Sequence, residues 1–263
     1  MSRSRNNESR KGSPKDYDRG VRGHLAIFLN NHHHFARSVV ITVALLAFLE
    51  ILPPFIRSAL LHGLLAHRFV SSMLFSFSLI ALSLLWSTGQ CIDVWAFLYF
   101  NFRGKRSLWL DRTMLGFTQL GNGLFGLLVA LILFFVGNHR LASELILGTL
   151  TLWLVVELVK SIIHRSRPFI KLTQTRIVGS RAGGRSFPSG HTSQSFFMVT
   201  LLVEHFQISL WLAIPLFALA GLVAITRMYV GAHYPRDVMA GAILGSVWGL
   251  LGIIVDTHFL EGR

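Results

Sequence analysis

Long stretches without a charged residue dominate the pattern of hydrophobic and polar positions along the chain. They include residues 69–92, 113–139, 205–226 and 238–255, each bounded on both sides by charged residues. Stretches of this length match membrane helices, since about 20 residues rising 1.5 Å each cross a hydrocarbon core about 30 Å thick. They lack the period-2 alternation of a membrane β-barrel. The pattern therefore predicts an all-α, polytopic membrane protein, because helices satisfy their own backbone polar groups in lipid.

The breaks between apolar stretches predict the order of the segments. A polar tail over 1–36 is followed by an extra apolar helical segment over 37–68, which Pro53 and Pro54 interrupt, and then by a membrane domain over 69–258. In that domain we expect a six-helix core with helices at about 69–90, 113–136, 141–164, 191–207, 209–227 and 236–256. The aromatic-rich stretch 92–102 is interpreted as a short helix lying at the membrane interface.

A stripe of small residues marks the last predicted helix. Gly241, Gly245 and Gly249 recur at a spacing that places them on one helix face. Small residues in membrane helices let a neighbouring backbone approach closely. We therefore expect another helix to pack against this stripe.

Composition and charge narrow the class of protein further. The chain is 52% hydrophobic and 14% charged, and its mean hydropathy is +0.55, which argues against a cytosolic globular enzyme. Its formal net charge of +13 is clustered in the tail and in residues 164–191, which contain no acidic residue. We interpret the tail as a cytoplasmic segment near anionic lipid headgroups rather than a nucleic-acid site, and 164–191 as the place where an anion is held. Cys91 is the sole cysteine, so no disulfide forms within the chain.

Candidate chemistry lies at the ends of the predicted helices. If the predicted helix 141–164 persists to Pro168, Lys160 and Arg167 lie on one face about two turns apart. Alternatively, each of the two cations only extends its charge toward the membrane surface.

A second polar stretch, residues 187–192, directly precedes an apolar helix. Ser189 and Gly190 open that helix, whose free N–H groups can bind an anion, and His191 adds an imidazole. The alternative is an ordinary helix cap with an incidental histidine.

The third stretch joins the last two predicted helices. His233 and Asp237 are four positions apart, so the carboxylate can accept from one ring nitrogen and leave the other free to act as a nucleophile. The alternative is a histidine–aspartate pair at the membrane interface that has no catalytic role.

Taken together, the patterns Lys-x6-Arg-Pro, Pro-Ser-Gly-His and Arg-x5-His-x3-Asp, in this order, resemble those of the type 2 phosphatidic acid phosphatase family. These are integral membrane lipid phosphatases that share a catalytic core with vanadium-dependent haloperoxidases. The chain departs from the family at Thr226, where serine is usual, and in the apolar segment 38–66 that precedes the usual six-helix core.

The resemblance implies a role for each candidate residue. His233 is the nucleophile that forms a phosphohistidine, Asp237 orients it, and His191 protonates the leaving oxygen and then activates water. The residues that hold the phosphate are Lys160, Arg167, Ser189, Gly190 and Arg227. No metal or other cofactor is expected, because the cations take the place of Mg²⁺. The run His32–His34 in the tail is interpreted as solvated rather than as a ligand set.

These roles predict a metal-independent membrane lipid phosphatase. Its expected substrate is the phosphomonoester or diphosphate headgroup of a lipid, either an isoprenoid diphosphate such as undecaprenyl diphosphate or a glycerophospholipid phosphate such as phosphatidylglycerophosphate. Phosphatidic acid and lipid A phosphate would suit the same cations. An anionic-lipid transporter and a catalytically inactive membrane scaffold of the same fold are the alternatives. The expected partners are the lipid substrate and the bilayer of the plasma (inner) membrane, without nucleic acid.

The face on which the active site lies depends on the segment 38–66. If this segment crosses the membrane, the positive-inside rule places the site in the cytoplasm. Glu50 and the two prolines leave only residues 38–49 uncharged and uninterrupted, which is short for a span. We therefore expect the segment not to cross, and the active site to lie on the non-cytoplasmic face, as the resemblance implies.

Overall fold

The computed structural model describes residues 54, 66–85, 87–102 and 107–261, and the chain divides into two compact units, Met1–His62 and Gly63–Arg263. Apart from Pro54, every described residue belongs to the second unit. The predicted tail 1–36, its His32–His34 run and nearly all of the predicted extra segment 37–68 lie outside the described residues.

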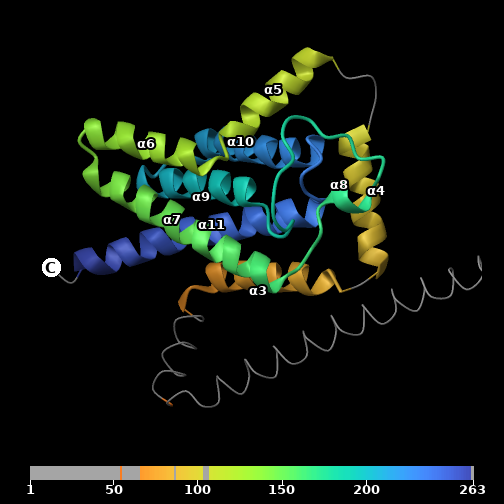
Figure 1. Ribbon diagram of the computed structural model, residues 1–263. Coiled ribbons are helices and arrows are strands. Elements are labelled where there is room, and N and C mark those ends of the chain that lie inside the picture. Colours follow the sequence, from red (N-terminus) through yellow and green to blue (C-terminus); the bar gives the residue numbers. More distant parts are fainter. Residues whose placement is uncertain (1–53, 55–65, 86, 103–106, 262–263) are drawn as a thin grey trace, which may run out of the picture. The chain divides into compact units, whose positions relative to one another are not determined.

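All regular structure in the described part of the second unit is helical, which confirms the predicted all-α class (Figure 1). The helices are α3 (Arg68–Ser83), α4 (Ser87–Phe102), α5 (Leu108–Gln119), α6 (Gly123–Phe135), α7 (His139–Ile162), α8 (Pro168–Lys171), α9 (Gly190–His205), α10 (Leu210–Tyr229) and α11 (Pro235–Glu261).

Several of these helices suit a bilayer. Among the described residues, 3 are long and apolar enough to cross a membrane, namely α7, α10 and the part Pro235–Ile254 of α11, and the bent pair α5 and α6 raises the number to up to 4. Large apolar side chains on these helices face outward, such as Trp211, which is 83% exposed, and Phe135, which is 79% exposed. Such surfaces suit contact with lipid rather than water. The membrane class is therefore supported, and the six-helix count stays a prediction.

Two predicted helices are each divided in the structure. The stretch 69–90 is not one helix, since α3 ends at Ser83, whose carbonyl oxygen accepts from Arg236 Nη1 at 2.6 Å. The stretch 113–136 also breaks, with a bend of 57° between α5 and α6. Asn122 caps α6 by accepting from the N–H of Leu124, and a Cβ at Gly121 would lie 2.5 Å from the carbonyl oxygen of His191. This close approach places the bend beside the start of α9.

The core of the unit is built around α9, which contacts α6, α7, α10 and α11. The glycine stripe of α11 faces it, as predicted: a Cβ at Gly245 would come 2.1 Å from the carbonyl oxygen of Ser193, and one at Gly241 would come 2.7 Å from that of Ser189. The two helices therefore pack backbone to backbone, and this contact fixes the start of α9 against the start of α11.

The helix α4 is packed against the rest of the unit through a buried face. Asp93, Phe97 and Asn101 recur every four residues along it, and all three are buried, while Trp95 is 71% exposed. The Asn101 amide donates to the carbonyl oxygens of Arg176 and Tyr229, both at 2.9 Å. Trp95 and Tyr99 are exposed while Phe97 is buried, so the interpretation of 92–102 as an interfacial helix stays a prediction.

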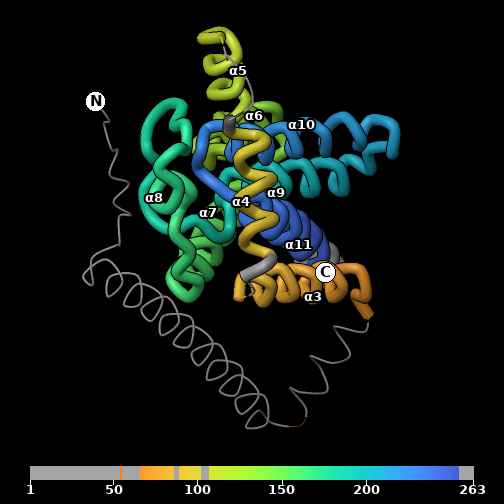
Figure 2. Tube along the Cα trace, turned by 90° about the vertical axis from the view of Figure 1, so that its right-hand side faces the viewer, coloured from red at the N-terminus to blue at the C-terminus, as the bar shows by residue number. Residues whose placement is uncertain are grey.

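The candidate residues gather at one end of the helix bundle. There α4 stands across the loop that contains α8 and across the junction of α10 and α11 (Figure 1, Figure 2). Contacts of α4 with both α10 and α11 hold this arrangement. Residues distant in sequence are thereby brought to a common site.

Candidate active site

His233 lies in the turn between α10 and α11 rather than on a helix. Gly231 allows this turn, since its φ is +85° and a Cβ there would come 2.5 Å from the carbonyl oxygen of Arg176. The backbone N–H of His233 donates to the carbonyl oxygen of Arg227 at 3.2 Å. This bond fixes the imidazole relative to the end of α10, and the residue is only 3% exposed.

The ring of His233 is held in one tautomer. Its Nδ1 lies 2.7 Å from the carbonyl oxygen of Ser186, which can only accept, so Nδ1 carries the proton and Nε2 has the lone pair. Arg167 Nη1 lies 3.1 Å from Nε2 and donates to it. Burial, together with the cations of Arg167 and Arg227, lowers the pKa of His233 to about 4, against the opposing charge of Asp237. The ring is therefore neutral at physiological pH.

Asp237 is close to His233 but is not its hydrogen-bond acceptor. The distance from Oδ2 to Nδ1 is 3.7 Å, whereas Oδ2 accepts from Ser186 Oγ at 2.5 Å and from the N–H of Tyr234 at 2.8 Å. Oδ1 accepts from Arg165 Nη1 at 2.5 Å. The expected direct bond fails because α11 begins after His233, so the carboxylate caps this helix instead. It fixes the turn and leaves a negative charge beside the imidazole.

Arg167 reaches the site from a loop and not from a helix. The helix does not persist to Pro168: α7 ends at Ile162, close to the predicted end near 164, and Arg167 is extended, with ψ at 157°. The residue before a proline disfavours the helical region, which explains this conformation. Its guanidinium turns toward the site, donating to the carbonyl oxygen of Gly183 at 2.6 Å as well as to His233.

Arg227, on the last turn of α10, contributes a second buried guanidinium. Its Nη1 donates to Thr118 Oγ1 at 2.9 Å, and Thr118 bonds in turn to Thr226 Oγ1 at 2.8 Å. Threonine in place of the usual serine at position 226 therefore supplies a hydroxyl to this chain of bonds. Arg227 Nε is buried and has no hydrogen-bond partner among the described residues. A buried donor without a partner is costly, so this nitrogen is suited to an incoming anion.

The start of α9 completes the set of predicted residues. Ser189 is the N-cap and is fully buried, its Oγ accepting from Thr192 at 3.0 Å, and the helix begins at Gly190. The first N–H groups of a helix have no intrahelical partner and attract anions. His191 lies on this first turn and interacts electrostatically with Arg227, His233, Lys160 and Arg167.

Lys160 is the most peripheral of the predicted phosphate ligands. It lies at the end of α7, where its Nζ pairs with Glu157 Oε1 at 2.7 Å. Its side chain is 14% exposed and that of Glu157 is 48% exposed. The charge of the ammonium is therefore partly compensated by a half-exposed carboxylate on the same helix.

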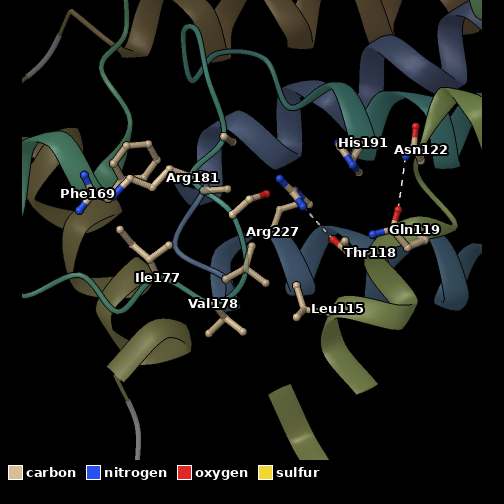
Figure 3. A pocket seen from close by; sticks show the side chains of 14 residues that line it. Leu115, Thr118, Gln119, Asn122, Phe169, Ile177, Val178, Arg181, His191 and Arg227 are labelled. Carbon is tan, nitrogen blue, oxygen red and sulfur yellow. Dashed lines mark hydrogen bonds between the residues drawn. The ribbon is translucent and has the colours of Figure 1, made fainter. Parts of the chain in front are cut away.

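A cavity of about 270 Å³ lies beside His191 and Arg227 (Figure 3), and the other predicted site residues, His233 among them, are not part of its lining. One part of its lining is polar, with Arg227, His191, Arg181, Thr118, Gln119 and Asn122. Another part is apolar, with Leu115, Phe169, Ile177, Val178, Val230 and Ala232. The cavity thus joins an anion-binding region to a hydrophobic one. Its lining comes from α5 and the turn after it, from the segment between α7 and α9, from α9, and from the end of α10 and the turn after it.

The basic stretch 164–191 is not one continuous anion-binding patch. Arg165 is bonded to two carboxylates from other helices, and Arg176 is bonded to Asp111. Of the arginines in this stretch, Arg167 reaches His233 and Arg181 lines the cavity. The cluster therefore divides its arginines between structural ion pairs and the site.

Some residues at the site were missed by sequence reasoning. Thr118 orients Arg227, and Ser186 holds both His233 and Asp237, but isolated hydroxyl residues give no signal in a sequence. Asp93 did give a signal in the sequence, since it is the sole acidic residue between positions 69 and 110, in a mainly apolar region.

Comparisons with known proteins agree with this architecture. Residues 141–258, which include every predicted site residue, match the PAP2 superfamily. A lipid A 4′-phosphatase of Bacteroides thetaiotaomicron is 42% identical over 85 residues, 32% of this chain and 37% of that protein. An undecaprenyl-diphosphatase of Sulfolobus acidocaldarius is 31% identical over 129 residues, 49% of this chain and 61% of that protein.

A solved structure is similar over a larger part of the fold. The PAP2-type phosphatidylglycerolphosphate phosphatase from Bacillus subtilis superposes with a TM-score of 0.62 and 25% identity, covering 72% of this chain and 96% of that one. The helical fold is thus similar to that of a PAP2-type membrane phosphatase. The match of residues 141–258 to the PAP2 superfamily and the similarity to this PAP2-type structure agree with the predicted resemblance. It spans 37% and 61% of the lengths of the two curated relatives above.

Proposed function

We propose that the chain is a metal-independent membrane lipid phosphatase that works through a phosphohistidine. The observation that carries this proposal is the state of His233: Nδ1 donates to Ser186, the ring is neutral, and the Nε2 lone pair faces Arg167. A neutral imidazole with one nitrogen fixed and the other available is what nucleophilic attack requires. The phosphatase names of its relatives support the same reaction class.

In the first step, a lipid phosphate enters the cavity and binds Arg227, Lys160 and the first N–H groups of α9. Its negative charge offsets the cations around His191, so that this ring takes up a proton. Arg167 exchanges its bond to His233 for one to a phosphate oxygen, which uncovers Nε2. Nε2 attacks phosphorus in line, and the bond between phosphorus and the lipid oxygen breaks. His191 gives its proton to that oxygen, and the cations balance the charge on the transferring group.

In the second step, the phosphohistidine is hydrolysed. His191, now neutral, takes a proton from water as the water oxygen attacks phosphorus. The bond between phosphorus and Nε2 breaks, which releases inorganic phosphate and restores neutral His233. Asp237, 3.7 Å from Nδ1, lowers the energy of the cationic ring that exists between the two steps.

The lining of the cavity supports a lipid as the substrate. Apolar side chains such as Phe169 and Ile177 lie on the same cavity as Arg227, so a phosphate and the first part of a hydrophobic tail can bind together. Arg181 adds a further cation to this cavity. We propose an isoprenoid diphosphate or a glycerophospholipid phosphate, in keeping with the names of the undecaprenyl-diphosphatase and of the phosphatidylglycerolphosphate phosphatase, whereas the lipid A 4′-phosphatase is named for a third kind of lipid phosphate.

For the membrane arrangement we propose a six-crossing core in the plasma membrane, with the active site on the non-cytoplasmic face. The candidate spans α7, α10 and α11 and the bent pair α5 and α6 contribute to this core. The interrupted segment 38–66 precedes it without crossing.

The test is phosphate release by the full chain, purified in detergent, from a panel of lipid monophosphates and diphosphates. We expect release from at least one member of the panel, undiminished by excess EDTA. His233→Ala should abolish it, while His205→Ala, a matched change at the opposite end of α9, should not. Loss of activity in EDTA that Mg²⁺ restores would contradict the mechanism, and lipid transport that survives His233→Ala would favour the transporter alternative.

A further inference from the structure

A buried ionic network lies beside the site, and the mechanism above does not use most of it. Asp93, on the buried face of α4, is 2% exposed. Its Oδ1 accepts from the backbone N–H of Arg236 at 3.1 Å, and its Oδ2 accepts from Arg236 Nε at 3.0 Å and from Arg165 Nη2. None of these three residues lines the cavity.

Arg165 connects Asp93 to the site. Its guanidinium donates through Nη2 to Asp93 and through Nη1 to Asp237 Oδ1, the latter at 2.5 Å, and it lies 4.3 Å from the ring centre of Tyr234. One planar group thus bridges a carboxylate of α4 and a carboxylate of α11. With Arg236, the network contains two cations and two anions, so removing one carboxylate leaves a buried cation uncompensated.

We propose that Asp93 is a positioning residue for catalysis, acting through Arg165 on Asp237 and thereby on His233; this inference rests on the proposed function. Asp237 holds Ser186 Oγ, and the carbonyl oxygen of Ser186 holds Nδ1 of His233. Without the Asp93 carboxylate, Arg165 keeps only Asp237 as an anionic partner and shifts toward it. The shift disturbs the orientation of the nucleophile and leaves the phosphate-binding cations in place.

The first measurement compares Asp93→Asn with wild type in phosphate release by the full chain. We expect kcat to fall by about 10- to 100-fold, the cost of misplacing a reacting group, with KM within about two-fold of wild type. Asp111→Asn is the matched control, since this carboxylate bonds Arg176 and Tyr229, and no hydrogen bond or ion pair among the described residues joins it to Asp237 or His233. It should retain the wild-type kcat and KM.

A double variant separates positioning from general destabilisation. If Asp93 acts through Asp237, the double variant Asp93→Asn/Asp237→Asn should be no slower than Asp237→Asn alone, because coupled residues are not additive. Additive losses in kcat, or a kcat for Asp93→Asn equal to wild type, would overturn the proposal.

Arg165→Lys is the second variant, for the case in which Asp93→Asn does not fold. Lysine keeps the charge but lacks the fork that bridges two carboxylates. We expect it to lower kcat with little change in KM, and an unchanged kcat would overturn the proposal. If wild type releases phosphate and these variants release it at the wild-type rate, the positioning role of Asp93 is refuted and the proposed function stands. If wild type releases none from any lipid phosphate, the proposed function fails and the positioning role falls with it.

Discussion

Acidification should leave His233 uncharged well below the pH at which an ordinary histidine gains a proton. In the unfolded chain the ring titrates near 6.5, while burial and the neighbouring arginines lower the pKa of His233 to about 4 in the folded protein. At 1.36 kcal/mol per pKa unit, this difference in pKa between the unfolded and the folded state corresponds to about 3 kcal/mol of folding stability. Because the unfolded chain takes up the proton first, this stability is present above about pH 6.5 and is lost as the pH falls toward 4.

The assay is ¹⁵N NMR of histidine-labelled protein in detergent, with the His233 signals identified by their loss in His233→Gln. We expect the neutral tautomer with the proton on Nδ1 to persist from about pH 8 to about pH 5, because the Ser186 carbonyl oxygen accepts that proton. Arg167→Gln should raise the pKa of His233, since it removes a cation 3.1 Å from Nε2. A midpoint near 6.5 in wild type, or a proton on Nε2, would refute the reasoning.

Other predictions concern the acid, the packing and the membrane face. His191→Ala should slow phosphoenzyme formation from a lipid phosphate by about 10²- to 10⁴-fold. The loss with p-nitrophenyl phosphate should be far smaller, since a good leaving group needs no proton, and equal losses in stopped-flow assays would argue against His191 as the acid. Gly245→Ala should lower the free energy of unfolding in detergent by about 1–3 kcal/mol, because the new Cβ would lie 2.1 Å from a backbone oxygen. Gly221→Ala should leave it unchanged, because a Cβ there has no atom within 4 Å. A cysteine at Gly183, where a Cβ has open space, should react with an impermeant maleimide in intact cells once Cys91 is replaced; labelling only after permeabilisation would place the site in the cytoplasm.

Much of the fold is visible in the sequence because membrane helices need long uncharged stretches. The same rule overlooks breaks within such stretches: the bend between α5 and α6 depends on Asn122 as a cap and on Gly121 touching α9, and neither contact is local. The glycine stripe of α11 was predictable, since small residues at a spacing of four have one common use in membrane helices.

The members of the site were predictable as residue types, and their contacts were less so. His233, Arg167 and Arg227 do converge at one end of the bundle. The partner of Nδ1 is a carbonyl oxygen from a loop, because α11 starts too late for Asp237 to reach His233 as a helical neighbour. Contacts that depend on where a helix begins, or on backbone atoms of a distant loop, leave no trace in residue spacing.

The central claim is that Nε2 of His233 becomes covalently phosphorylated, and trapping the intermediate tests it most directly. The full chain is mixed with ³²P-labelled lipid phosphate, quenched in alkali to preserve the P–N bond, and mapped by peptide. We expect label on His233 in wild type and none in His233→Ala. With a ³²P-labelled substrate that has a good leaving group, such as p-nitrophenyl phosphate, His191→Ala should carry more label than wild type, because hydrolysis of the phosphohistidine is slowed. Label on another residue, or turnover by His233→Ala at a substantial fraction of the wild-type rate, would contradict the account.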